Sequence, residues 1–463
     1  MRRPNILFLM TDEQKFDTFG FVNSVLKTPN LDKLISNSVF FNNAYCSNPS
    51  CVPSRAAIVT GKYPTACQCP TYISTLPKDE VTFMAKLQEA GYYTAVVGKQ
   101  HFDASEIYKG YDYECIVDGH SQTAPYENIV AFAEYLKEKG VYKVKQVGEK
   151  LICGSEWTGD IENHIDYFIG EKGREWLANH IDTTKAADAK PWFMTLSFPG
   201  PHQPYDCEGT AYAANYNLAD MTLEESKVAD LETKPPHYKH LNPRAYIDQY
   251  DEELYRRTKR SYYANMSLID EKIGEVIAML KEKDEYDNTL IIFSTDHGDF
   301  MGDFGLVTKA QYLSEGLMHV PLFVKPPIKD FQGFRTNDLV TNIDIASTCL
   351  TAAKAPEKIT EHMENHPYND YWEKDTVSAR DYVYMEAHDI KGVIRDGIKT
   401  LYYVERDYGE LYDLNTDPAE RINLWDDPKY QTAKMAGMAK IIDKMFWLSP
   451  KSSMQWNVNA PKI

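Results

Sequence analysis

Residues 48–61 read Asn-Pro-Ser-Cys-Val-Pro-Ser-Arg-Ala-Ala-Ile-Val-Thr-Gly, which predicts a loop that leads into a short helix. Pro53 suits a first helical turn, because its φ is fixed near the helical value and its missing N–H has no partner there. Gly61 can adopt the left-handed conformation that ends a helix. Cys51 would then lie at a helix N-terminus beside the cation of Arg55, where negative charge is favoured. The segment therefore predicts a cysteine suited to chemistry on anions.

Apolar runs on both sides of this segment predict strands, and several of them are followed at once by polar side chains. The predicted strands are 5–10, 39–45, 93–97, 192–198, 289–294 and 320–324. The predicted helices are 28–35, 76–91, 164–180, 251–283 and 343–353. Residues 102–162 predict loops with short helices, and 206–245 predict a long surface loop. Strands that alternate with helices predict an α/β fold with a large, doubly wound, mostly parallel sheet.

The pattern changes near residue 355, where short strand-like pieces separated by turn residues replace the long apolar runs. These pieces are 382–385, 392–395, 399–404 and 409–414, and a helical pattern follows at 430–447. They predict a small antiparallel sheet plus a helix. We therefore expect two units: a catalytic α/β domain over 1–355 and a smaller C-terminal α+β subdomain over 356–463.

Composition, segment lengths and cysteine spacing argue against several classes of protein. The net charge of −18 argues against a nucleic-acid partner, because such binding depends on neutralising phosphates with Lys and Arg. The apolar run at 6–10 is too short for a signal peptide and no stretch is long enough to span a membrane, so we expect a cytoplasmic protein without a membrane partner. The eight cysteines are scattered and predict no disulfide framework. The spacing of Cys46, Cys51, Cys67 and Cys69 does not match the paired knuckles of a zinc site.

Polar residues follow the predicted strands at the edge where ligands of doubly wound sheets bind. Asp12, Glu13, Asp296 and His297 provide mostly oxygen ligands, which suit Ca²⁺, Mg²⁺ or Mn²⁺ better than Zn²⁺. The hydrogen-bond donors expected around them are Arg55, Lys99, His101, His202 and Lys309. Each residue alone has an ordinary interpretation as a cap or a turn. Together they predict a site for a tetrahedral oxyanion and its transition state.

Residues 51–61 also match the motif Cys-x-Pro-Ser-Arg-x₄-Thr-Gly of the formylglycine-dependent sulfatases of the Cys type. The chain resembles this family, which has the alkaline-phosphatase-like fold. Further motifs that carry the resemblance are Gly98-Lys99-Gln100-His101, Pro201-His202-Gln203-Pro204, Asp296-His297-Gly298-Asp299 and Glu410-Leu411-Tyr412-Asp413-Leu414, with Asp417-Pro418 and Asn423-Leu424. The resemblance covers nearly the whole chain.

The resemblance implies that a maturation enzyme oxidises Cys51 to formylglycine. The aldehyde hydrates to a geminal diol, one hydroxyl of which attacks sulfur and displaces the alcohol. The second hydroxyl then expels sulfate as the aldehyde forms again. A thiol or a serine has no second hydroxyl and would lack this route of release.

The same resemblance assigns roles to individual residues. Asp12, Glu13, Asp296 and His297 would bind one divalent cation, Ca²⁺ before Mg²⁺ or Mn²⁺, together with modified Cys51. Arg55 and Lys99 would hold the diol and the charge beside the cation, and His101 would assist in deprotonating the diol. His202 and Lys309 would bind the sulfate, and one of them would protonate the leaving oxygen.

Three positions depart from the family pattern. Glu13 stands where many members have aspartate, so its longer side chain would ligate differently. Gln100 replaces a frequent tryptophan, which changes the shape of the pocket. The pair Asp296-His297 stands where other members have Asp-Asn, and it also occurs in phosphonate monoester hydrolases and choline sulfatases of the same superfamily.

These observations leave three hypotheses. The first is a sulfuric ester hydrolase that acts on a small sulfate ester, with a sulfated sugar as the expected substrate. The second is a phosphonate monoester or phosphodiester hydrolase that uses the same site, because the two kinds of ester share charge and shape. The third is a non-catalytic binder of sulfated ligands in which Cys51 is unmodified. The oligomeric state is not predicted.

Overall fold

The structure of the protein, a computed structural model, describes residues 3–102, 110–118, 130–141, 146–147, 156–181, 190–236, 238, 252–355, 362–374, 377 and 379–449. Large parts of the predicted loop region 102–162 lie outside these residues, as do Cys153 and, in the predicted loop 206–245, residues 237 and 239–245.

An eight-stranded, mostly parallel sheet forms the centre of the molecule, with strand order β10-β2-β9-β8-β1-β7-β3-β4. In chain order its strands are β1 (Asn5–Asp12), β2 (Val39–Tyr45), β3 (Tyr93–Gly98), β4 (Tyr113–Ile116), β7 (Trp192–Pro201), β8 (Thr289–Thr295), β9 (Leu322–Lys325) and β10 (Phe334–Thr341). Strand β9 runs antiparallel to both of its neighbours, and the other pairs are parallel. The predicted fold class is confirmed.

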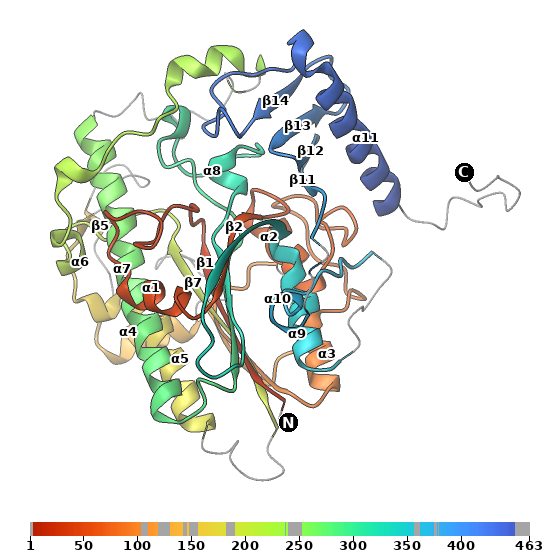
Figure 1. The fold of residues 1–463 in the computed structure, drawn as a ribbon. Helices are drawn as coiled ribbons and strands as arrows, with labels where there is room; N and C mark the ends of the chain where they lie inside the picture. The colour runs from red at the N-terminus through yellow and green to blue at the C-terminus, as the bar shows by residue number, and fades with distance from the viewer. Residues whose placement is uncertain are drawn as a thin grey trace, which may run out of the picture.

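Helices cover both faces of this sheet (Figure 1). On one face lie α1 (Pro29–Ile35), α5 (Ile165–His180) and α7 (Glu252–Glu282), and on the other lie α2 (Cys51–Thr60), α3 (Phe83–Glu89) and α9 (Ile345–Ala352). Strand β1 shows why, since its alternate side chains enter different apolar clusters. Leu7 and Leu9 pack with the first set of helices, whereas Phe8 and Met10 pack with the second.

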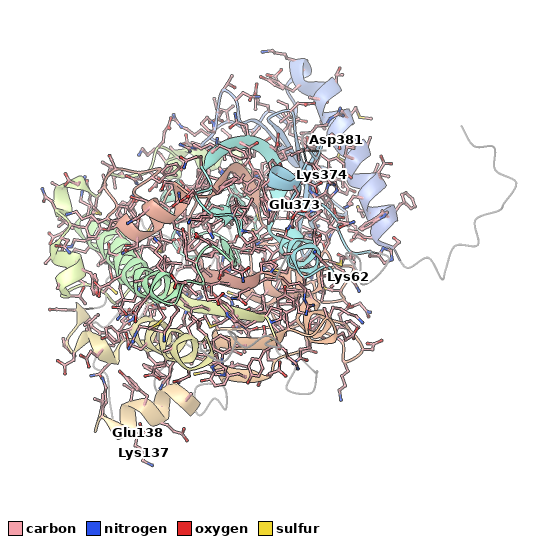
Figure 2. All side chains as sticks on the ribbon, turned by 60° about the horizontal axis from the view of Figure 1, so that its bottom comes forward. Lys62, Lys137, Glu138, Glu373, Lys374 and Asp381 are labelled. Atoms are coloured by element: carbon pink, nitrogen blue, oxygen red, sulfur yellow. The ribbon has the colours of Figure 1, made fainter. Side chains whose placement is uncertain are left out.

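Shorter elements join or border these layers. They are α4 (Val130–Glu138), α6 (Ala211–Ala214), α8 (Glu315–Met318), α10 (Asp370–Glu373), the ribbon β5 (Gln146–Val147) and β6 (Glu156–Trp157), and the 3₁₀ helices Ile161–Asn163, Leu218–Asp220, Val228–Thr233, Asp303–Gly305, Asn342–Asp344 and Pro428–Tyr430. Helix α4 is amphipathic: Phe132 and Leu136 are buried. Lys137 and Glu138, near its end, point away from the body of the protein (Figure 2).

The segment 48–61 folds as predicted. Helix α2 begins at Cys51, after Ser50 in an extended conformation, and ends at Gly61, whose φ is +67°. Asn48 ties the preceding loop to the C-terminal part of the chain, because its Nδ2 donates to the carbonyl of Glu386 at 2.7 Å. The cysteine is therefore held at the first turn of a helix whose residues are all buried.

The predicted C-terminal sheet and helix are present. Strands β11 (Val383–Ala387), β12 (Ile390–Arg395), β13 (Ile398–Tyr403) and β14 (Gly409–Asp413) form an antiparallel sheet, beside which lies α11 (Gln431–Leu448) (Figure 1). An apolar cluster joins this part to the rest, since Tyr384 and Ile441 pack with Ala57 of α2. The domain boundary near residue 355 stays a prediction.

Some predicted elements differ from the structure. The helix expected over 76–91 begins only at Phe83, because Thr82 caps it by accepting from the backbone N–H of Ala85 at 3.3 Å. Strands β4 and β10 lie in segments where no strand was expected. Residues 206–236 hold three short helices rather than a plain loop.

The described residues bear on the expectations about membrane spans and cysteine pairing. Among the described helices, none combines the length and the apolar character needed to cross a bilayer. The seven cysteines that the structure describes are free thiols.

Candidate active site

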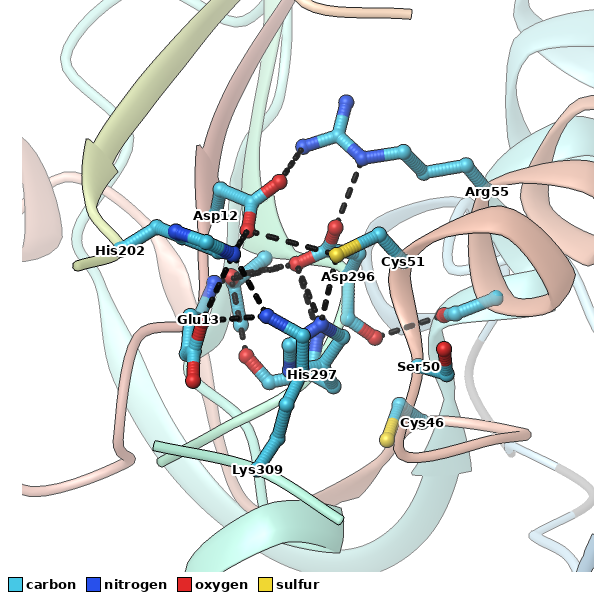
Figure 3. Close-up of polar contacts among 12 residues, drawn as sticks. Asp12, Glu13, Cys46, Ser50, Cys51, Arg55, His202, Asp296, His297 and Lys309 are labelled. Atoms are coloured by element: carbon cyan, nitrogen blue, oxygen red, sulfur yellow. Dashed lines mark hydrogen bonds and ion pairs between the residues drawn. The ribbon is translucent and has the colours of Figure 1, made fainter. Parts of the chain in front are cut away.

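Four adjacent parallel strands end at one edge of the sheet and deliver polar side chains there. Along the sheet these strands are β8, β1, β7 and β3. The residues at their carboxyl ends are Asp296 and His297, Asp12 and Glu13, His202, and Lys99. Helix α2, which follows β2, adds Cys51 and Arg55 (Figure 3).

Arg55 links the two carboxylates of the site. Its Nε lies 2.7 Å from Asp296 Oδ2, and its Nη2 lies 2.8 Å from Asp12 Oδ2. Its Nη1 donates to the carbonyl of Lys99 at 2.8 Å and to Ser197 Oγ at 3.1 Å. Since Arg55 is 2% exposed, this guanidinium is a fixed cation within a buried network.

Asp12 is an ionised carboxylate in this network. Its Oδ2 also contacts Lys99 Nζ at 2.7 Å. Burial raises the pKa of Asp12, but Lys99 and Arg55 bring that pKa well below its usual value. The site therefore keeps a negative charge at the end of β1.

The thiol of Cys51 lies next to this charge. Its Sγ is 3.1 Å from His297 Nε2 and 3.7 Å from Asp12 Oδ1. Burial and Asp12 raise the pKa of Cys51, yet Lys309, Lys99 and His297 lower it below the ordinary value. Cys51 thus differs from buried Cys46, whose pKa is raised by burial.

Backbone and side-chain contacts fix the orientation of Asp296 and His297. Asp296 Oδ1 accepts from the N–H groups of Glu13 at 3.1 Å and His297 at 2.9 Å. His297 Nδ1 donates to the carbonyl of Gly298 at 2.8 Å, so its Nε2 faces Cys51. Burial lowers the pKa of His297, but Asp296 and Cys51 raise it to about 9.

Four of these side chains have the arrangement of a metal site. One ligand atom from each of Asp12, Cys51, Asp296 and His297 lies within 4.8 Å of the others, and all four residues are buried. Two carboxylates and one imidazole beside Cys51 fit a divalent cation. Zinc-type pairing of Cys51 with Cys46, Cys67 or Cys69 does not occur among the described metal-ligand groups.

Glu13 belongs to a neighbouring group of ligand-type side chains, which shares Asp12 and includes His202. Its Oε2 lies 2.5 Å from Lys309 Nζ and 3.1 Å from His202 Nε2. His202 Nδ1 donates to the carbonyl of Gln203 at 2.7 Å, so its Nε2 can accept from Lys309 Nζ, 2.6 Å away. Among the described residues the buried Oε1 of Glu13 has no hydrogen-bond partner, and burial raises the pKa of Glu13 well above its usual value. This unsatisfied oxygen also fits a cation nearby.

His101 lies near Lys99 at the border of the site. Its ring is edge-on to that of Tyr72, with centroids 5.6 Å apart, and no described residue hydrogen-bonds its buried Nδ1. Burial and Lys99 lower the pKa of His101 to about 4. The imidazole is therefore neutral at pH 7.

Three supporting residues were not predicted. Ser197, inside β7, accepts from Arg55. Asp118 accepts from the N–H groups of Gln100 at 2.6 Å and His101 at 3.0 Å. Asn342 Nδ2 donates to the carbonyl of Asp296 at 3.3 Å. Asp118 follows β4 and Asn342 follows β10, the two strands that the sequence pattern did not predict. Predicting those strands would have pointed to both residues, because polar residues after strands are site candidates.

Gln100 hydrogen-bonds with Tyr111 and with the backbone of Lys99. Its Oε1 accepts from Tyr111 Oη at 2.7 Å, and its Nε2 donates to the carbonyl of Lys99 at 3.0 Å. The glutamine thus fixes the backbone beside Lys99.

Family models identify the class of protein as the sulfatases, which are sulfuric ester hydrolases. A family model for sulfatases matches residues 4–355, and a model for the C-terminal region of N-sulphoglucosamine sulphohydrolase matches residues 302–445. The chain belongs to the sulfatase family, which confirms the resemblance found in the sequence.

Curated relatives agree with this family. A choline-sulfatase of Rhizobium meliloti is 28% identical over 443 residues, which cover 92% of this chain and 83% of that protein. An N-acetylglucosamine-6-O-sulfatase of Bacteroides thetaiotaomicron is 26% identical over an alignment of 518 positions, gaps included. This alignment covers 99% of this chain and 88% of that protein.

Solved structures share the fold. The phosphonate monoester hydrolase of Agrobacterium radiobacter superposes with a TM-score of 0.83 at 19% identity, covering 97% of each chain. A structure in complex with its substrate D-glucosamine-2-N,6-O-disulfate superposes with a TM-score of 0.71 at 21% identity, covering 96% of this chain and 98% of that one.

Proposed function

We propose that the protein hydrolyses a small carbohydrate sulfate ester after a maturation enzyme has oxidised Cys51 to formylglycine. The observation that carries this proposal is the position of Cys51 Sγ, 3.1 Å from His297 Nε2 and 3.7 Å from Asp12 Oδ1. An aldehyde hydrate at this position would lie among carboxylates, imidazoles and cations, where its charge can be stabilised.

A divalent cation is part of the proposal, with Ca²⁺ preferred to Mg²⁺ or Mn²⁺. Asp12, Glu13, Asp296 and His297 would hold it with modified Cys51, and the mostly oxygen ligands support a hard cation. When bound, it would supply Lewis-acid stabilisation of negative charge. Arg55 and Lys99 would keep Asp12 ionised and correctly oriented, since both contact its Oδ2.

Proton transfer and substrate binding fall to the remaining polar residues. His101, neutral because its pKa is about 4, would accept a proton from the hydrated aldehyde. The pKa of Lys309 is raised despite burial because Cys51 and Glu13 favour its charged form, so the ammonium group would bind sulfate oxygens. His202, which contacts Lys309, would share that binding and pass a proton toward the leaving oxygen.

The choice of a carbohydrate ester is supported by relatives that act on sulfated glucosamine. One is the N-acetylglucosamine-6-O-sulfatase, and another is the protein solved with D-glucosamine-2-N,6-O-disulfate. The cytoplasmic location expected from the sequence stays a prediction.

The test is the hydrolysis of sulfate esters by protein produced together with a formylglycine-generating enzyme. We expect turnover of 4-nitrophenyl sulfate and of glucosamine 6-sulfate, and loss of both in Cys51→Ala. Cys115→Ser, which changes another buried cysteine, is the matched control and should keep activity. A matured sample that hydrolyses no sulfate ester would contradict the proposal.

A second candidate is a phosphonate monoester or phosphodiester hydrolase. It is favoured by His297, which stands where many sulfatases have asparagine. Comparing kcat/KM for 4-nitrophenyl sulfate with that for a phenyl phosphonate ester separates the two. Choline sulfate belongs in the same panel, because a choline-sulfatase is among the relatives.

A non-catalytic role is the remaining alternative. It requires that Cys51 stay a thiol in the native host. The intact mass of the peptide that contains Cys51 decides the point, because conversion of the thiol to an aldehyde changes that mass. A persistent free thiol would exclude both enzymatic functions.

A further inference from the structure

A second cluster of metal-ligating side chains lies outside the active site, formed by His164, Asp206 and Cys207. One ligand atom of each residue lies within 4.8 Å of the others. His164 directly precedes helix α5, and the other two residues belong to the segment that follows β7. His164 and Cys207 are buried, whereas the side chain of Asp206 is 16% exposed and leaves a path to solvent.

The two distances from His164 to the other residues match two edges of a tetrahedral metal centre. His164 Nε2 lies 3.2 Å from Asp206 Oδ1 and 3.7 Å from Cys207 Sγ. Zinc bonds of the usual lengths at tetrahedral angles give nitrogen–oxygen and nitrogen–sulfur separations of about 3.3 and about 3.6 Å. We propose that His164, Asp206 and Cys207 bind a zinc-type transition metal ion, with water in the fourth position.

The donor set distinguishes this cluster from the active site. One thiolate, one imidazole and one carboxylate are ligands that Zn²⁺ accepts, whereas Ca²⁺ takes oxygen ligands. The cluster therefore selects a borderline-soft ion, and the oxygen-rich group around Asp12 selects a hard one.

The backbone that carries Cys207 is held in place without the ion. The backbone N–H of Cys207 donates to Ser261 Oγ at 2.8 Å, and Ser261 Oγ donates to the carbonyl of Tyr205 at 2.7 Å. The ring of Trp157 packs edge-on against His164, with centroids 4.9 Å apart. Such support fixes ligand geometry before a metal binds.

Metal binding changes the protonation of two ligands. His164 Nδ1 accepts from the N–H of Asp166 at 3.2 Å, so in the metal-free neutral ring the proton is on Nε2. Coordination through Nε2 moves that proton to Nδ1, which lies 3.6 Å from Asp166 Oδ2 and can turn toward this carboxylate. Cys207 releases its thiol proton to solvent as the metal–sulfur bond forms.

The site would position the end of β7 rather than take part in catalysis. Asp166 also accepts from the N–H of Gly200 at 3.0 Å and from Asn265 Nδ2 at 2.9 Å. Gly200 lies two residues before His202 of the active site. A metal on His164 would therefore stabilise the contacts of Asp166 with helix α7 and with the end of β7, which precedes His202.

The test is a Co²⁺ titration of the metal-free full-length Cys51→Ala protein, because this change removes the thiol of the active site. We expect a near-ultraviolet thiolate-to-cobalt absorption band whose final intensity corresponds to one thiolate-bound Co²⁺ per chain. The band should disappear in Cys51→Ala/Cys207→Ser and persist in the matched control Cys51→Ala/Cys115→Ser. No band, or a band that survives replacement of Cys207, would overturn the proposal.

Asp206→Asn provides a second variant at a partly exposed position, where the fold is easily kept. In the Cys51→Ala background this change should leave the thiolate band in place but weaken Co²⁺ binding by about tenfold or more. Unchanged affinity would show that Asp206 only hydrogen-bonds His164 and would contradict the proposed ligand set. Circular dichroism of each variant verifies that the chain is folded.

Discussion

Asp12 and Glu13 are adjacent carboxylates, both fully buried, and their pKa values move in opposite directions. Burial raises the pKa of each. Asp12 contacts Lys99 and Arg55, which reverse the effect, whereas burial dominates at Glu13 despite Lys309. The charges around each carboxylate therefore set the direction of its pKa shift, because Asp12 contacts two cations, whereas Asp299 and Cys51 add to the effect of burial at Glu13.

Backbone geometry explains why Asp12 and Glu13, which are neighbours in sequence, have different closest partners. Asp12 is the last residue of β1, and its side chain meets the cations from α2 and from the end of β3. Glu13 has a φ of +62°, which takes the chain out of the strand and turns its side chain toward Lys309 and His202. Asp12 thus belongs to a fixed buried network, and Glu13 pairs with a lysine that is 16% exposed.

Replacing Asp12 should cause the largest loss in the free energy of unfolding among the substitutions that compare the two carboxylates. In chelator-treated protein, Asp12→Asn would leave Lys99 and Arg55 without the carboxylate that both contact. Removing one partner of a buried ion pair costs about 3–5 kcal/mol. Urea unfolding should show a loss of this size.

The matched control is Asp426→Asn, because the side chain of Asp426 is 95% exposed. This change should alter the free energy of unfolding by less than about 0.5 kcal/mol. Equal effects of the two substitutions would show that the Asp12 network contributes no stability.

Replacing the lysine that contacts each carboxylate should destabilise the protein to different extents. Lys99→Met would leave Asp12 paired with Arg55 and still cost about 3 kcal/mol. Lys309→Met should cost only about 1 kcal/mol, because Glu13 can take a proton when its cation is gone. Both losses are measured by urea unfolding in chelator, and a larger loss for Lys309→Met would reverse the assignment of charge.

Glu13→Gln should have a smaller effect, and one that depends on pH. The folded-state pKa of Glu13 lies above the ordinary value of 4.5, so between these two values the folded protein binds more protons than the unfolded chain. The contribution of Glu13 to the free energy of unfolding is thus fully present below pH 4.5, and it is lost as the pH rises through the folded-state pKa. Glutamine does not titrate, so its contribution to stability does not change with pH. In the presence of chelator, the free energy of unfolding of Glu13→Gln at pH 8 should therefore exceed that of the native protein by about 1 kcal/mol.

The same measurement at pH 4.5 and below provides the internal control, since the advantage of Glu13→Gln should disappear there. A gain that is equal at both pH values would mean that Glu13 is not protonated on folding. A loss at pH 8 would mean that Glu13 is a stabilising anion like Asp12.

Strands buried on both faces were predictable from sequence, and so were the site residues that follow them. The apolar runs of β1, β7 and β8 have almost no polar interruption, which also located Asp12, His202 and Asp296. Strand β10 reads Phe-Arg-Thr-Asn-Asp-Leu-Val-Thr and lies at the sheet edge with exposed positions, so its pattern resembles a loop. Asn342, which follows it, was missed for the same reason.

Side-chain direction could not be predicted from strand order. The sequence grouped Asp12 and Glu13 as equivalent metal ligands, because both follow the same apolar run. The positive φ of Glu13 gives the two side chains different closest partners, and nothing in local composition specifies that angle. The role of Glu13 as a ligand stays a prediction, since its Oε2 contacts Lys309 and His202.

The central claim is that Cys51 must become an aldehyde before the site can turn over a sulfate ester. Samples with different fractions of formylglycine at position 51, quantified by peptide mass spectrometry, should be assayed with 4-nitrophenyl sulfate. We predict that activity rises in proportion to the aldehyde fraction and extrapolates to zero in fully unmodified protein. Full activity in protein whose Cys51 is a free thiol would contradict the account.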